Sequence, residues 1–198
     1  EGNTLIHALA GNGYANIIKE LREAGVNLDT PNKDGMTPAH LAALNGHLDI
    51  IKVLQEAGVN LEAQDKDRYT PAHIAAQEGH LGIIKALREA GVNLETPTKK
   101  RWTPAHLAAQ NGHPDIKKEL SEALKVRNLA KSISLLIAPQ PWLGDEESNA
   151  QFQGIIEIIY KKLVKTYGSD IASLEESMGL DLSKSLDAKT LKANVSVR

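Results

Sequence analysis

The chain has 198 residues, of which 41% are hydrophobic and 24% are charged, and its net charge is −2. This composition is typical of a folded soluble protein and excludes a disordered chain. The near-neutral charge argues against nucleic-acid binding, which needs clustered lysines and arginines to displace counterions. Because cysteine is absent, disulfides, thiolate metal sites and a cysteine nucleophile are excluded, and we expect a cytoplasmic location.

A short motif recurs through the first part of the chain. Thr-Pro-Ala-His occupies residues 37–40, 70–73 and 103–106, always 33 residues apart, and a degenerate copy, Thr-Leu-Ile-His, occupies residues 4–7. Two glycine series keep the same register, and they consist of Gly13, Gly46, Gly79 and Gly112, and of Gly25, Gly58 and Gly91. A period maintained over four copies predicts a chain built from stacked repeats.

Each period predicts two short helices. In residues 34–66 the first helix begins at the Thr37-Pro38 pair, because threonine caps a helix and proline fits its first turn, and it ends near Gly46. The second helix ends at Gly58, in a left-handed conformation. It places three apolar residues at helical spacing toward a shared core, namely Ile50, Ile51 and Leu54. Residues 59–69 then form the loop to the next repeat.

The pattern Thr-Pro-x-His-x-Ala with a period of 33 residues resembles the ankyrin repeat. The resemblance covers about residues 1–124 and implies an all-α solenoid of four repeats joined by hairpin loops, at about 1–33, 34–66, 67–99 and 100–124. The family usually has leucine after the proline, whereas this chain has Ala39, Ala72 and Ala105. Residue 1 is not methionine and falls inside a repeat, so we expect a fragment of a longer protein or a processed form.

The fourth repeat departs from the pattern at its end, where Leu124 replaces the expected glycine. We expect one long helix over 115–137 that caps the solenoid, because an uncapped end exposes core residues. Residues 125–198 do not share the repeat. Further helices are expected there, over about 146–167, 170–178 and 182–192. They form either a small helical domain or a set of helices packed against the last repeat.

All seven histidines lie in the repeats, in two registers. A metal ladder along them is disfavoured, because stacked helices lie about 8–10 Å apart whereas zinc lies about 2 Å from each ligating nitrogen. In the resembled family, the threonine and histidine of the motif belong to a hydrogen-bonded scaffold. The tail holds no histidine, and acidic residues at helix starts are explained by the helix dipole. We therefore expect no catalytic residue, no metal and no cofactor.

The positions that vary between repeats are the candidates for binding. Three sets of positions in this chain resemble the contact row on the concave face of ankyrin proteins. They are the residue before the threonine, the two residues before the tip glycine and the pair ending the first helix. With the two arginines that replace a tip glycine, the candidates are Lys33, Asp34, Met36, Leu44, Asn45, Lys66, Asp67, Arg68, Tyr69, Gln77, Glu78, Lys99, Lys100, Arg101, Trp102, Gln110 and Asn111. Aromatic residues, methionine and arginine are enriched at protein interfaces. In the alternative interpretation, Tyr69 and Trp102 only pack over neighbouring loops.

Two tips lack their glycine and have Arg68 and Arg101 instead, so those loops are expected to be strained or reshaped. Residues 99–102 are Lys-Lys-Arg-Trp, which predicts an acidic partner at this tip.

The main functional hypothesis is a non-enzymatic module, an adaptor or targeting domain, that binds another protein through its concave face. We expect a monomer that binds no nucleic acid. In the alternative hypothesis, the chain is the targeting fragment of a larger enzyme or of a bacterial effector in the host cytosol, and its C-terminal helices contact a membrane or a second partner.

Overall fold

The computed structural model describes residues 2–137 and residue 158 of the chain. Contacts divide the chain into two units, Glu1–Glu122 and Ala123–Arg198. Every regular element in the described residues is a helix, as the sequence predicts. The helices expected over 146–167, 170–178 and 182–192 lie outside the described residues, except for residue 158, which is helical.

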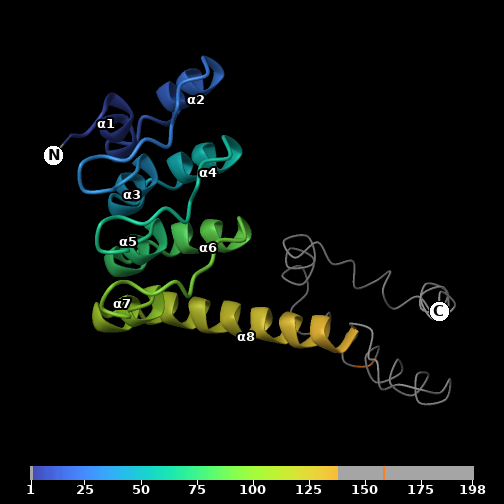
Figure 1. The fold of residues 1–198 in the computed structure, drawn as a ribbon. Coiled ribbons are helices and arrows are strands. Elements are labelled where there is room, and N and C mark those ends of the chain that lie inside the picture. Colours follow the sequence, from blue (N-terminus) through green and yellow to red (C-terminus); the bar gives the residue numbers. More distant parts are fainter. Residues whose placement is uncertain (1, 138–157, 159–198) are drawn as a thin grey trace, which may run out of the picture. The chain divides into compact units, whose positions relative to one another are not determined.

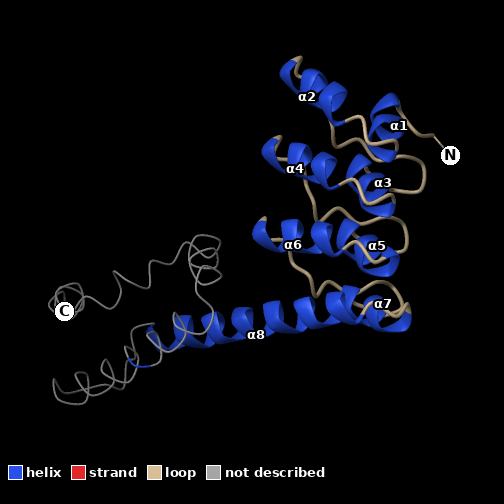
Figure 2. Cartoon of the chain, turned by 180° about the vertical axis from the view of Figure 1, so that it is seen from behind, coloured by secondary structure: helices blue, strands red, loops and turns tan. Residues whose placement is uncertain are grey.

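The first unit stacks four helix pairs in two layers (Figure 1). The inner layer holds the first helix of each pair, α1 (Leu5–Gly11), α3 (Pro38–Leu44), α5 (Pro71–Glu78) and α7 (Pro104–Gln110). The outer layer holds α2 (Ala15–Glu23), α4 (Leu48–Glu56), α6 (Leu81–Glu89) and the first part of α8 (Pro114–Ile137). Figure 2 shows the same two layers from behind. The solenoid of four repeats is therefore confirmed.

Each inner helix starts where the threonine predicts it. Thr37, Thr70 and Thr103 have extended backbones at the N-cap, and the proline that follows each of them occupies the first turn. The inner helices end after only two turns. Outer helices end at an alanine followed by a left-handed glycine, with φ of 74° at Gly25, 69° at Gly58 and 74° at Gly91. Short helices of this kind depend on packing for their stability.

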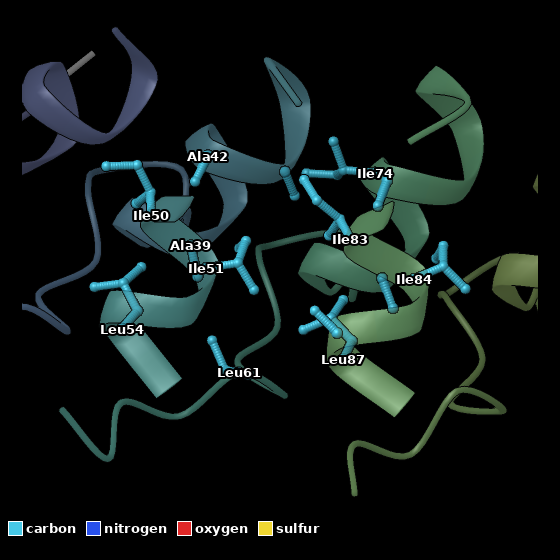
Figure 3. Close-up of a cluster of buried hydrophobic side chains, with 14 of the residues drawn as sticks. Ala39, Ala42, Ile50, Ile51, Leu54, Leu61, Ile74, Ile83, Ile84 and Leu87 are labelled. Atoms are coloured by element: carbon cyan, nitrogen blue, oxygen red, sulfur yellow. The ribbon is translucent and has the colours of Figure 1, made fainter. Parts of the chain in front are cut away.

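The core lies between successive pairs, and the outer helices contribute its largest fully buried hydrophobic side chains. Ile50, Ile51 and Leu54 of α4 are fully buried, as are Ile84 and Leu87 of α6. In Figure 3, Ile83 lies on the side of α6 that faces the preceding repeat, and Ile84 lies on the opposite side. The inner helices contribute alanines such as Ala39 and Ala42, whose small side chains allow neighbouring helices to approach closely.

The last helix is longer than the outer helices of the other repeats. The sequence predicts a helix over 115–137, and α8 runs continuously over Pro114–Ile137. Its first turns are the outer helix of the fourth repeat, with Ile116 and Leu120 buried. The helix passes from the first unit into the second near Glu122. The proposed capping of the solenoid by this helix stays a prediction.

Candidate partner-binding face

The loops that precede α3, α5 and α7 lie along one edge of the first unit, beside the inner helices (Figure 1). We define the tip row as residues 33–36, 66–69 and 99–102. The pairs that end the inner helices, which we call the helix-end row, are Leu44 and Asn45, Gln77 and Glu78, and Gln110 and Asn111. Together these two rows contain every candidate that the sequence predicts.

Buried histidines hold the backbone of the tip row. Each inner-helix histidine places Nε2 within hydrogen-bond distance of the carbonyl oxygen that precedes the threonine of the next repeat. These pairs are His7 and Met36 at 2.9 Å, His40 and Tyr69 at 3.0 Å, and His73 and Trp102 at 3.1 Å. The three carbonyls belong to the varying positions of the tip row, so a fixed scaffold positions the residues that differ between repeats.

The other ring nitrogen of these histidines identifies the tautomer. The Thr37 N–H donates to Nδ1 of His40 at 3.0 Å, and the Thr70 N–H donates to Nδ1 of His73 at 3.1 Å. Because a backbone N–H can only donate, Nδ1 must be the acceptor, and the proton of the neutral ring lies on Nε2. Desolvation lowers the pKa of His40 and of His73 below the usual value, so both rings stay neutral at pH 7.

A second series of histidines links each outer helix to the repeat before it. Nε2 of His47 lies 3.0 Å from the Gly11 carbonyl oxygen, that of His80 lies 3.2 Å from Leu44, and that of His113 lies 3.0 Å from Gln77. Leu44 and Gln77 belong to the helix-end row. Histidines of neighbouring repeats therefore hold the backbone at both ends of the inner helices.

The second series requires a glycine beneath each imidazole. Gly46 has φ of 76°, and a Cβ built on it would lie 2.7 Å from the His80 ring. Gly79 has φ of 84°, and its Cβ would lie 2.6 Å from the His113 ring. The glycine of one repeat and the histidine of the next thus form one structural feature. The sequence shows that both residues recur, but their spacing does not tell which carbonyl the histidine contacts.

Each tip is closed by the side chain of the residue just before it, which is Asn32, Asp65 or Thr98. Oδ1 of Asp65 accepts hydrogen bonds from the backbone N–H of Asp67 at 2.9 Å and of Tyr69 at 2.7 Å. Successive tips are also joined to one another. The Lys66 N–H donates to the Asp34 carbonyl at 3.0 Å, and the Lys99 N–H donates to the Asp67 carbonyl at 3.1 Å. These bonds make the tip row a continuous, preorganised strip of backbone.

The two arginines at the tips keep the backbone conformation of the glycine that they replace. Gly35 has φ of 82°, while Arg68 and Arg101 have φ of 65° and 62°. The loops are thus strained but not reshaped, which agrees with the first of the two sequence-based expectations. A left-handed conformation costs a residue with a Cβ roughly 1–2 kcal/mol. Backbone strain of this kind concentrates at functional sites.

The apolar and the charged members of the tip row differ in exposure. Met36, Tyr69 and Trp102 are half-buried, and the Tyr69 ring packs against that of His73 with centroids 5.5 Å apart. Tyr69 therefore packs within its own repeat while part of its surface stays exposed. The charged side chains of the tip row are all exposed, and they are Lys33, Asp34, Lys66, Asp67, Arg68, Lys99, Lys100 and Arg101.

Positive charge is concentrated on the tip row. It holds six basic and two acidic side chains, for a net charge of +4, whereas the rest of residues 1–124 holds seven basic and fourteen acidic ones. Nζ of Lys99 lies 3.6 Å from Oδ1 of Asp67, an exposed pair that contributes little to stability. The positive strip therefore lies on an otherwise acidic body.

The helix-end row has structural as well as exposed groups. The side-chain amides of Asn45 and Asn111 donate to the carbonyls of Leu41 and Leu107, four residues back. The backbone N–H of each asparagine donates to the same carbonyl, so the side-chain amide adds a second hydrogen bond at the end of the helix. Leu44 and Glu78 are exposed on this row. Asn45 and Asn111 thus stabilise helix ends, a role that the sequence-based prediction of a contact row did not include.

Within residues 2–137 and 158, no group of three or more His, Asp or Glu side chains is placed to hold a metal ion. In this same part of the chain, no helix is both long enough and apolar enough to span a membrane.

The stacked helix pairs, their 33-residue period and the shared histidine bonds define an α-helical repeat protein of the solenoid class. A family model described as ankyrin repeats (3 copies) matches residues 1–65 and 56–130, and the chain belongs to this family. A search of curated proteins finds no match to the chain. Ankyrin repeats are generally non-enzymatic modules that bind other proteins.

Proposed function

We propose that this chain is a non-enzymatic interaction module that binds a partner protein across the tip row and the helix-end row. The observation that carries the proposal is the positive, exposed strip on a fixed backbone. The charged side chains of the tip row extend from a backbone whose carbonyl and N–H groups are already hydrogen-bonded. Binding to such a surface orders only side chains, so little conformational entropy is lost.

The charge of the tip row supports an acidic partner. Its basic character increases along the solenoid, from one lysine beside Asp34 in the first of the three tips to Lys99, Lys100 and Arg101 in the last. Positive and negative patches that match across an interface speed association and select the correct partner. We infer that an acidic segment of the partner lies over residues 99–102, with Trp102 and Tyr69 as the apolar contacts beside it.

The strained arginines allow a test that does not damage the fold. Replacing Arg68 and Arg101 by glycine removes two charges and relieves two left-handed Cβ atoms. We expect the double variant Arg68→Gly/Arg101→Gly to be more stable by about 1 kcal/mol per site in urea unfolding. We also expect it to capture less of the partner from cell lysate, with a smaller dependence on salt. Greater stability together with weaker binding identifies arginines that are retained for recognition.

The matched control removes two lysines from the outer helices. Lys52 of α4 and Lys85 of α6 are exposed and lie away from the tip row, so Lys52→Ala/Lys85→Ala changes the net charge equally. We expect this control to retain the partner. A second variant, Met36→Ala/Tyr69→Ala/Trp102→Ala, tests the apolar contacts once its folding has been checked by thermal melting. Equal capture by the wild type and by both tip-row variants would show that the partner binds elsewhere.

The alternative role as a targeting fragment or effector depends on residues 138–198, which lie outside the described residues except for residue 158. The cytoplasmic location and the monomeric state also stay predictions.

A further inference from the structure

The tip row offers the same two kinds of side chain three times along the solenoid. The first position of every tip is a lysine, and the fourth position is apolar. The basic series consists of Lys33, Lys66 and Lys99, and the apolar series consists of Met36, Tyr69 and Trp102. The lysines are exposed and the apolar side chains are half-buried. Each tip therefore presents one positive charge and, three residues later, one apolar surface.

The stacking of the inner helices sets the spacing of the tips. A single threonine separates each tip from the inner helix that follows it, so the tips recur at the distance between stacked helices, which is about 8–10 Å. Hydrogen bonds keep the tips at this distance, from the Lys66 N–H to the Asp34 carbonyl and from the Lys99 N–H to the Asp67 carbonyl. The basic and the apolar series therefore both repeat at a fixed interval.

This interval selects one conformation for a segment that contacts successive tips with equivalent residues. In a polyproline II helix, every third residue lies on the same side, about 9.3 Å further along the axis. In a β-strand, side chains alternate between the two faces, so residues on one side recur at about 6.6 or 13 Å. In an α-helix, they recur at about 5–6 Å and again, after seven positions, at about 10.5 Å. Of these three conformations, only the polyproline II helix repeats within the spacing of the tips.

We propose that the tip row binds a partner segment in the polyproline II conformation that has an acidic residue at every third position. Its carboxylates contact Lys33, Lys66 and Lys99 in turn, and its prolines lie against the apolar series. Aromatic side chains commonly bind such segments, which lose little conformational entropy because they are already extended. The inference rests on the proposed binding of an acidic partner at the tip row, and it adds the conformation and the sequence spacing of the bound segment.

The charges beside the basic series predict where the segment binds most tightly. The second position of the tip is Asp34 in the first tip, Asp67 in the second and Lys100 in the third. Nζ of Lys99 lies 3.6 Å from Oδ1 of Asp67, and both side chains are exposed. Because an exposed ion pair is weak, a carboxylate of the partner can replace Asp67 there. The third tip has no acidic side chain of its own, so the carboxylate over residues 99–102 contributes most.

Three peptides of one composition test the spacing. Each contains three aspartates and six prolines, with a fluorescent label at the N-terminus and an amidated C-terminus, so that charge and conformation are held constant. Successive aspartates are separated by one, two or three prolines, and the remaining prolines are placed at the ends. Fluorescence anisotropy measures binding to the full chain at low salt, where screening is weakest. We expect the two-proline peptide to bind about fivefold more tightly than either of the others.

A substitution at the middle tip tests the contact itself. We expect Lys66→Ala to weaken binding of the two-proline peptide about twofold to fivefold and to reduce its advantage over the other peptides. The matched control is Lys52→Ala, because Lys52 is exposed on α4 in the same repeat, away from the tip row. This control should leave the affinities of all three peptides unchanged.

Equal affinities for the three peptides, or tighter binding of the one-proline or the three-proline peptide, would overturn the inference. If equal affinities are accompanied by weaker binding to Arg68→Gly/Arg101→Gly, the acidic partner at the tip row still stands, so the two proposals fail separately. Absence of binding by all three peptides would also overturn the inference. Capture of the partner from cell lysate then remains the test of the proposed function.

Discussion

At the scale of single residues, the histidine of the Thr-Pro-Ala-His motif links stability to the binding face. His40 and His73 are fully buried, and each accepts through Nδ1 within its own repeat and approaches a tip-row carbonyl of the next through Nε2. A neutral ring can do both, whereas an imidazolium cannot accept from a threonine N–H. The neutral ring protonated at Nε2 therefore links the start of its own inner helix to the backbone of Tyr69 or Trp102 in the next repeat.

The first prediction concerns pH. Burial lowers the pKa of His40 and His73 in the folded state below the ordinary value of 6.5. Between that value and the lower folded pKa, the unfolded chain thus binds more protons than the folded chain. The free energy of unfolding therefore falls as the pH is lowered through this range. We expect urea unfolding to show full stability above about pH 6.5 and a progressive loss below it.

The measurement that supports this assignment is the ¹⁵N spectrum of the imidazoles. At pH 7, His40 and His73 should give the shifts of a neutral ring protonated at Nε2. Imidazolium shifts at that pH, or a free energy of unfolding that rises on acidification from pH 7 to pH 5, would contradict the pKa shifts and the tautomer together.

At the scale of elements, the sequence predicts most of the fold. The threonine-proline pairs mark the start of α3, α5 and α7, and the uninterrupted pattern after Leu124 predicts the length of α8. These features are local, since capping and helix breaking act within one turn. The partners of His47, His80 and His113 are not local. They lie 36 residues away and depend on how repeats stack.

The second prediction tests this stacking at a pair of matched glycines. Gly79 and Gly112 occupy the same position of the repeat, with φ of 84° and 76°, but only Gly79 has a histidine ring against it. Alanine at either position bears the left-handed strain of roughly 1–2 kcal/mol. We expect Gly79→Ala to cost more than Gly112→Ala, because its Cβ also meets the His113 ring at 2.6 Å. Urea unfolding of both variants measures the difference, and equal losses would show that the ring moves away at no cost.

At the scale of the whole molecule, the candidate face is a property of several repeats at once. Sequence comparison between repeats identifies which positions vary, and this selects the tip row. It does not show that Met36, Tyr69 and Trp102 are half-buried, because their exposure depends on the neighbouring repeat. It also does not separate Asn45 and Asn111, which stabilise helix ends, from residues that are free to contact a partner.

The last prediction concerns the order in which the solenoid opens. Stability in a repeat array is approximately a sum over repeats and their interfaces, so a repeat with one interface opens more easily than one with two. The first repeat has an exposed Ile17, whereas the third has Ile83 and Ile84 buried on opposite sides of α6. We therefore expect native-state hydrogen exchange to be faster in α1 and α2 than in α5 and α6. Peptide-level mass spectrometry measures this, and uniform protection across the four helices would show that the repeats open as a single unit. The expected gradient leaves Tyr69 and Trp102 in the better-protected part of the solenoid, where a preorganised contact face requires them.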